Sequence, residues 1–90
     1  MNNTRREQLK EIMEKVILLK DNLYDIRCDI ESVKDDERES YDNIPESLLE
    51  TEKAYKSQEC IDNMDEIDYK FDYIDDYLDE VISCIEECIE

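Results

Sequence analysis

The chain has 90 residues, which is enough for one small domain. Its 28 Asp and Glu residues outnumber 11 Lys and Arg, giving a net charge of −17, and it contains no His and no Gly. The lack of His excludes an imidazole base or metal ligand, and the lack of Gly excludes the loops that bind phosphate through Gly backbone. A chain this acidic repels nucleic acid, so we expect no direct binding to it.

Hydropathy and the N-terminal residues point to a cytoplasmic protein. The longest apolar run, Val16–Leu19, is too short to cross a membrane. The stretch 1–6 leads into charged residues, so we do not expect a signal peptide. We therefore expect the four Cys residues to stay reduced in the cytoplasm of the cell.

The first predicted element is a long helix over about residues 4–42. Thr4 followed by Glu7 has the spacing of a capping box, which predicts that this helix starts at Thr4. Apolar residues then recur with gaps that alternate between three and four, which is the a/d pattern of a coiled coil. The positions in this first seam are Leu9, Ile12, Val16, Leu19, Leu23, Ile26, Ile30 and Val33.

A break at Pro45 separates this helix from a second one. Proline lacks an N–H donor, and the residue before it avoids helical geometry, so we predict a tip over about 43–50. A second helix is predicted over about 51–89, and its seam has the same alternating gaps, with Cys60 as an extension at its start. The positions in this second seam are Met64, Ile67, Phe71, Ile74, Leu78, Val81, Ile85 and Cys88.

The two seams match each other when the helices run antiparallel. Pairing residues whose numbers add to 97 gives every seam residue an apolar partner, from Leu9 with Cys88 to Val33 with Met64. We predict an all-α fold, an antiparallel two-helix hairpin in one domain, 1–90. Pairing between two chains remains the alternative. The flanking pairs predicted by this register are Lys20 with Asp75, Arg27 with Asp68, Asp29 with Lys70, and Met13 with Ile82.

Two helices bury little surface, so self-association is expected. We expect the hairpin to leave one side of each seam incompletely covered, and several other apolar or aromatic side chains fall beside the seams. We predict that they form a homodimer contact and complete a four-helix bundle. The predicted self-association residues are Ile17, Leu18, Tyr24 and Tyr77.

The charge is concentrated in the second helix. Residues 1–34 hold seven basic and seven acidic residues, whereas residues 59–90 hold one basic and thirteen acidic. Such a face suggests a mimic of the nucleic-acid backbone, and the alternative is a solvated face that serves solubility. Tyrosines interleave the acids and would anchor a partner. The predicted partner-binding residues are Asp62, Asp65, Glu66, Tyr69, Asp72, Tyr73, Asp76, Asp79 and Glu80.

No residue pattern points to catalysis, to a cofactor or to a metal. In the predicted hairpin, Cys28, Cys60 and Cys88 lie at different heights, so the four Cys cannot gather into a zinc site. We interpret Cys60 and Cys88 as small apolar seam residues. Paired carboxylates acting as acid and base need a concave pocket, which a two-helix hairpin is not expected to offer.

The stretch Glu39-Ser-Tyr-Asp-Asn-Ile-Pro-Glu-Ser-Leu48, with Glu59-Cys-Ile-Asp-Asn-Met-Asp-Glu-Ile67, resembles small acidic helical-hairpin proteins encoded by phages and mobile elements of Gram-positive bacteria. The resemblance covers roughly residues 35–90 and implies a phage context, in which such proteins often inhibit host defence nucleases. We therefore expect an inhibitor that covers the basic surface of a host defence protein such as a CRISPR effector. The alternative is a scaffolding coiled coil that only self-associates.

Overall fold

The computed structural model describes residues 1–90 and is entirely helical. The helices are α1 (Asn3–Asp42), the short 3-10 helix η1 (Glu46–Leu48) and α2 (Glu52–Ile89). The predicted all-α class is confirmed, and both long helices begin and end within one residue of the predicted bounds.

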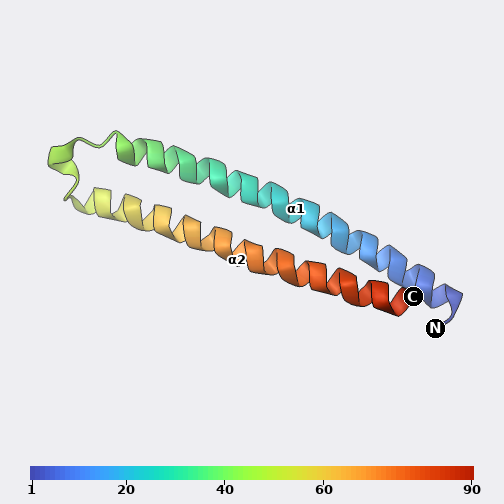
Figure 1. The fold of residues 1–90 in the computed structure, drawn as a ribbon. Coiled ribbons are helices and arrows are strands. Elements are labelled where there is room, and N and C mark those ends of the chain that lie inside the picture. Colours follow the sequence, from blue (N-terminus) through green and yellow to red (C-terminus); the bar gives the residue numbers. More distant parts are fainter. The chain divides into compact units, whose positions relative to one another are not determined.

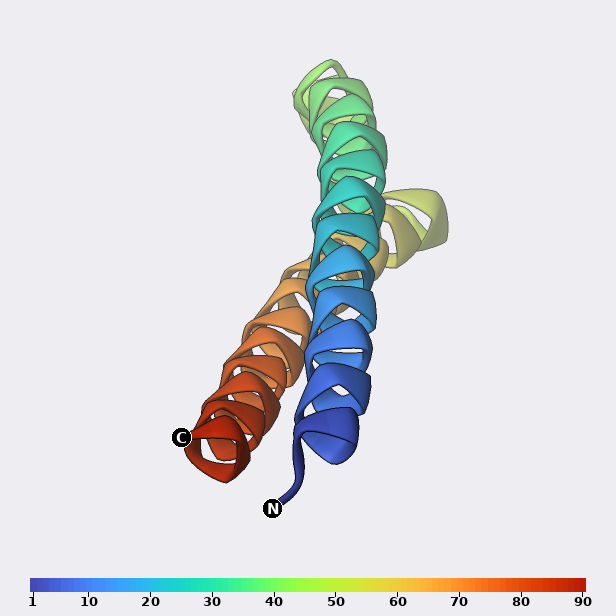
Figure 2. The ribbon, with the colours of Figure 1, turned by 90° about the vertical axis from the view of Figure 1, so that its right-hand side faces the viewer.

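Contacts divide the chain into two units, and both long helices contribute to each. The terminal unit comprises residues 1–25 and 71–90, and in it the two chain ends lie side by side (Figures 1 and 2). The tip unit comprises residues 26–70, in which α1 runs to the turn and α2 returns antiparallel to it (Figure 1). Taken by itself, the tip unit is a helical hairpin, as predicted.

Short polar side chains fix where both helices begin. The side-chain oxygen Oδ1 of Asn2 accepts a hydrogen bond from the backbone N–H of Arg5 at 2.8 Å. Asn2 is therefore the N-cap of α1, and the predicted capping box at Thr4 is wrong, because α1 has already begun there. Thr51 caps α2 in the same way, accepting from the N–H of Ala54 at 3.3 Å.

Burial shows which side of each helix meets the other. On α1 the less exposed positions again recur with gaps of three and four, and so do those of α2. The most buried residues are Leu23, Lys34, Ala54 and Ile61. The less exposed positions of α1 are Arg6, Leu9, Met13, Val16, Lys20, Leu23, Arg27, Ile30, Lys34, Glu37 and Tyr41. Those of α2 include Ala54, Ser57, Ile61, Met64, Asp68, Phe71, Asp75, Leu78, Ile82, Ile85 and Ile89.

Half of each predicted seam therefore lies outside the contact. Val33 is 58 % exposed and Ile26 is 48 % exposed, although both were predicted to face the second helix. One side of each seam is therefore left uncovered, as expected for a lone hairpin. The predicted burial of both members of each seam pair is wrong, because the two helices cover one apolar column and the mixed column beside it, which on α1 holds Met13, Lys20, Arg27 and Lys34. The exposed seam residues are Ile12, Leu19, Ile26 and Val33 on α1, and Cys60, Ile67, Ile74, Val81 and Cys88 on α2.

Ion pairs between α1 and α2 explain why the contact between the helices includes the mixed column and not the whole of each predicted seam. In the tip unit, Arg27 Nη2 lies 3.0 Å from Asp68 Oδ1, and in the terminal unit Lys20 Nζ lies 3.7 Å from Asp75 Oδ1. Both pairs confirm the prediction. Lys70 does not pair with Asp29 as predicted, because it lies 3.8 Å from Glu66 of its own helix.

Candidate functional site

The carboxylates of α2 divide into two groups. Four of them lie toward α1 and form ion pairs with its basic residues: Asp65, Asp68, Asp75 and Asp79. Asp72 and Glu86 are exposed but share the stripe of Asp65 and Asp79 beside α1. The other carboxylates of α2 are exposed and lie on the remaining sides of the helix: Glu52, Glu59, Asp62, Glu66, Asp76, Glu80 and Glu87.

Most of the predicted partner-binding residues are exposed, and two of them pair with α1. In the terminal unit Asp72, Tyr73, Asp76 and Glu80 are exposed, and in the tip unit Asp62, Glu66 and Tyr69 are exposed as well. Asp65 and Asp79 differ from the expectation of an outward side chain. Asp65 forms ion pairs with Lys34 and Arg38, and Asp79 forms an ion pair with Lys20. Their seven-residue spacing with Asp72 could have revealed this, since it places them beside the column of Asp68 and Asp75.

The two tyrosines that were predicted to anchor a partner are largely exposed. Tyr69 of the tip unit is 68 % exposed, and Tyr73 of the terminal unit is 66 % exposed. Within each unit the tyrosine has acidic neighbours on the same helix, Glu66 beside Tyr69 and Asp76 beside Tyr73. A ring with so much free surface can bury it against a partner at little cost in conformational entropy.

Lys34 is the most enclosed charged group of the chain. Its Nζ lies 2.7 Å from Glu31 Oε2 and 3.1 Å from Asp65 Oδ1, and Arg38 Nη2 lies 3.3 Å from the same Asp65 oxygen. The hydrogen bond to Glu31, followed by that to Asp65, raises the pKa of Lys34 above its ordinary value of 10.5. This cluster joins α1 to α2 within the tip unit.

Lys34 should stabilise the fold in a pH-dependent way. Because its pKa is raised on folding, its contribution is complete below about pH 10.5 and is lost as the pH rises through the folded-state pKa. We expect Lys34→Gln to lower the free energy of unfolding by about 0.5–1 kcal/mol at pH 9. Urea unfolding at pH 9 and about pH 11.5 should show that this difference shrinks at the higher pH.

The matched control for this measurement is Lys10→Gln. Lys10 also pairs with a glutamate three residues away, Glu7, but both side chains are well exposed. The control should cost less than Lys34→Gln at pH 9. An equal cost for the two substitutions, or a Lys34→Gln cost that does not change with pH, would contradict the role assigned to Lys34.

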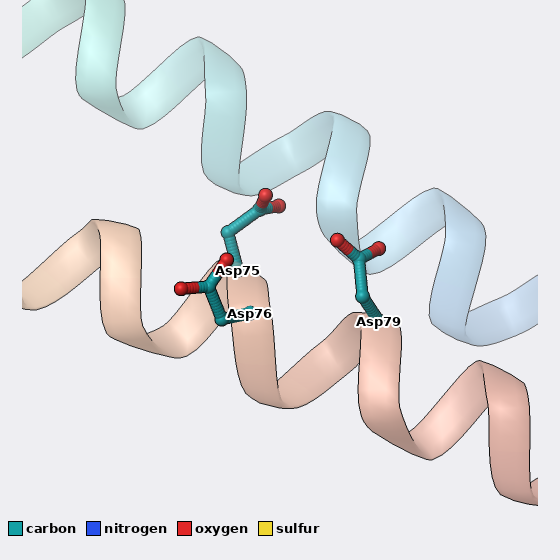
Figure 3. Close-up of side chains that lie close together, drawn as sticks. All are labelled: Asp75, Asp76 and Asp79. Carbon is teal, nitrogen blue, oxygen red and sulfur yellow. The ribbon is translucent and has the colours of Figure 1, made fainter.

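Three aspartates of the terminal unit bring their carboxylates together (Figure 3). Oxygens of Asp75, Asp76 and Asp79 lie within 4.8 Å of one another. Figure 3 shows Asp75 and Asp79 pointing toward α1, while the Asp76 carboxylate is turned to the side. Lys20 of α1 pairs with both Asp75 and Asp79, and the hydrogen bond with Asp79 raises the pKa of Lys20. The lysine thus supplies a positive charge between Asp75 and Asp79.

A pocket of about 630 Å³ lies at the turn of the tip unit, although no pocket was expected. Its walls are mainly apolar, with Ile44, Pro45 and Leu48 among them. One polar contact crosses it, in which the Ser57 hydroxyl donates to Glu37 Oε1 at 2.5 Å. The end of α1, the turn and the start of α2 all line this pocket, which helix periodicity alone does not indicate.

All four cysteines are free and exposed. This differs from our interpretation of Cys60 and Cys88 as packed apolar seam residues. Both lie in the outer column of the seam, meaning the exposed seam residues that the other helix does not cover. Cys28 and Cys60 belong to the tip unit, and Cys84 and Cys88 to the terminal unit.

The predicted self-association residues are all exposed in the terminal unit. Ile17 and Tyr24 are seven residues apart and share one stripe of α1, while Leu18 lies on the adjoining outer side. Tyr77 lies on α2, where it lines a shallow apolar hollow with Val81, Cys84, Ile85 and Cys88.

No family model, curated protein or solved structure matches this chain. Neither long helix holds a stretch apolar enough to cross a membrane.

Proposed function

We propose that the chain is a non-enzymatic binding module that covers a basic, nucleic-acid-binding surface of another protein. The observation that carries the proposal is the division of the carboxylates on α2. Four of them form ion pairs with basic residues of α1, and seven more are exposed on the remaining sides of the helix. Those seven form no ion pair with α1, so pairing with α1 does not explain them.

The spacing of the exposed carboxylates fits a partner that binds phosphates. Residues three or four positions apart on a helix lie roughly 5–6 Å from one another. Successive phosphates of one nucleic-acid strand are about 6–7 Å apart, with a rise of about 3.4 Å per nucleotide. In the terminal unit Asp72, Asp76 and Glu80 follow one another in steps of four. Tyr73 beside them would supply a desolvated anchor, since charge alone steers association but gives little specificity.

The biological setting that we propose follows from the resemblance of residues 35–90 to acidic hairpin proteins of phages and mobile elements. In that setting the partner is a host defence protein, such as a CRISPR effector, in the cytoplasm of a bacterial cell. The module acts by occupying the surface that nucleic acid would otherwise occupy, and it needs no cofactor or metal for this.

A second candidate function is a scaffold that only self-associates. The observation that favours it is the exposed outer column of each helix, which includes Ile26 and Val33 on α1 and Ile67 on α2 in the tip unit. Burial of these side chains by a second copy would give a four-helix bundle, the dimer predicted from the sequence. In this case the acids serve solubility.

Affinity capture from host-cell lysate, followed by competition with DNA, separates the two functions. The immobilised chain should retain a basic protein that DNA and added salt displace. The triple variant Asp76→Lys, Glu80→Lys and Glu87→Lys should lose that protein, with capture falling at least tenfold. Asp79 is left unchanged because it pairs with Lys20.

The control is a triple variant with the same change in net charge on α1: Glu11→Lys, Asp21→Lys and Asp25→Lys. These carboxylates are exposed too, and they belong to the same terminal unit. Capture should survive in the control, and circular dichroism should show unchanged helix content in both variants. Equal loss in both would indicate that net charge alone acts, and equal retention in both would leave the scaffold function.

A further inference from the structure

We propose that a second copy of this chain docks on one particular face of the tip unit, an apolar face that carries no acid on α2. The proposal rests on the self-association described above, and it assigns that association to a surface other than the predicted residues Ile17, Leu18, Tyr24 and Tyr77. We call it the open face, and define it by Ile26, Ile30 and Val33 of α1 and Cys60, Met64 and Ile67 of α2.

Contacts place these residues on one side of the tip unit. Val33 lines one shallow hollow with Met64 and Ile67, which Asp29 of α1 borders, and a second one with Cys60 and Met64, which Glu37 of α1 borders. Ile30 and Met64 are half-buried beneath, while Val33 and Cys60 remain exposed. Side chains of both helices therefore form one apolar surface, on which another pair of helices can pack.

The ion pairs lie on the opposite side of the tip unit. On α1 the stripe of Leu23 and Ile30 separates Ile26 and Val33 from the stripe of Arg27 and Lys34. On α2 the stripe of Ser57 and Met64 separates Cys60 and Ile67 from the stripe of Ile61 and Asp68. Arg27 pairs with Asp68, and Lys34 with Asp65. The ion pairs between α1 and α2 therefore lie on one side of the tip unit, and the apolar residues of the open face lie on the other.

The charge pattern of α2 selects a second copy rather than a basic partner. Within the tip unit, three adjacent stripes of α2 hold no acidic residue, although the rest of the helix is dense with them. These stripes are Lys53, Cys60 and Ile67; Ser57 and Met64; and Lys56, Asn63 and Lys70. A basic protein would find no carboxylate on the α2 side of the open face, whereas a chain of net charge −17 can approach its own copy there without strong repulsion.

The two long edges of the open face, which we call its rims, carry opposite charges. The α1 rim carries Asp29 and Asp36, and the α2 rim carries Lys56 and Lys70. The Lys70 and Lys56 side chains are each 70 % exposed, so both can reach another molecule in spite of their pairs with Glu66 and Glu52. When α1 of one copy lies antiparallel beside α2 of the second copy, Asp29 meets the partner's Lys70. The same contact forms twice, as two-fold symmetry requires.

Sedimentation equilibrium at micromolar concentration tests this assignment. The wild-type chain should have twice its chain mass of 10.9 kDa. Val33→Asp combined with Ile67→Asp should return it to a single chain with helix content retained, because both side chains are exposed in one chain. The control Ile17→Asp combined with Leu18→Asp should remain dimeric, although it also removes two exposed apolar side chains.

A charge exchange tests the rims without touching the apolar residues. Asp29→Lys should weaken the dimer at least tenfold, and Asp29→Lys with Lys70→Asp should restore it. A wild-type monomer at about 100 μM overturns the self-association itself. Dimerisation that survives Val33→Asp with Ile67→Asp, or that the charge exchange fails to restore, overturns the open face. Neither result bears on the acidic surface, which is tested separately by capture, and a monomeric variant should still capture the basic protein.

Discussion

Ile61→Ala should destabilise the protein by about 2–4 kcal/mol, whereas Ile67→Ala in dilute solution should cost about 1 kcal/mol or less. The two isoleucines are six residues apart on α2, and both belong to the tip unit. Ile61 is 4 % exposed, so its truncation leaves a cavity between α1 and α2. Ile67 is 37 % exposed and lies in the outer column, so solvent can fill the space that its truncation leaves.

Urea unfolding followed by circular dichroism measures both substitutions under the same conditions. The cost of Ile67→Ala should increase with protein concentration if a second copy covers the open face, while the cost of Ile61→Ala in the hairpin contact should not. Equal costs for the two substitutions at submicromolar concentration would contradict the observed division of the seam. A larger cost for Ile67→Ala than for Ile61→Ala would support the contact predicted from the sequence, whose seam contains Ile67 but not Ile61.

The helices and their pairing could be predicted from the sequence because each rests on local or repeated signals. Pro45 marks the turn, and the heptads give the length of both helices. The pairs Lys20 with Asp75 and Arg27 with Asp68 follow from the antiparallel register. The start of α1 was missed because Asn2 and Thr4 are both good N-cap residues, and sequence alone does not decide between them.

Which column of each seam stays uncovered could not be predicted, since an a/d heptad looks the same in a pair of helices and in a bundle of four. The charged residues beside the seam held the missing information. Lys20, Arg27 and Lys34 repeat every seven residues on α1, opposite the repeat of Asp68 and Asp75 on α2. Those pairs draw the mixed column into the contact, and for the same reason Ile26 and Val33 lie outside it.

Added salt should raise the thermal stability of the chain while it weakens binding to a basic partner. Residues 59–90 carry thirteen acidic residues against one lysine, and carboxylates three or four positions apart on α2 repel each other by about 0.2–0.5 kcal/mol per pair. Screening relieves this repulsion, and it also weakens the few ion pairs with α1, each of which contributes less than about 1 kcal/mol. Because the repelling pairs outnumber the attracting ones, the net effect of salt on folding is stabilising.

Thermal unfolding between about 20 mM and about 500 mM NaCl measures this effect, since the screening length falls from roughly 20 Å to roughly 4 Å over that range. We expect the midpoint to rise by about 4–8 °C for each kcal/mol of repulsion that is screened. Asp76→Asn with Glu80→Gln should raise the midpoint at low salt and reduce its dependence on salt, because it removes repelling charges and no pair with α1. A midpoint that falls with salt would mean that the ion pairs of Lys20, Arg27 and Lys34 dominate the electrostatics of folding. Repulsion among the exposed carboxylates would then not destabilise the fold, and no binding function would be needed to account for such a destabilisation.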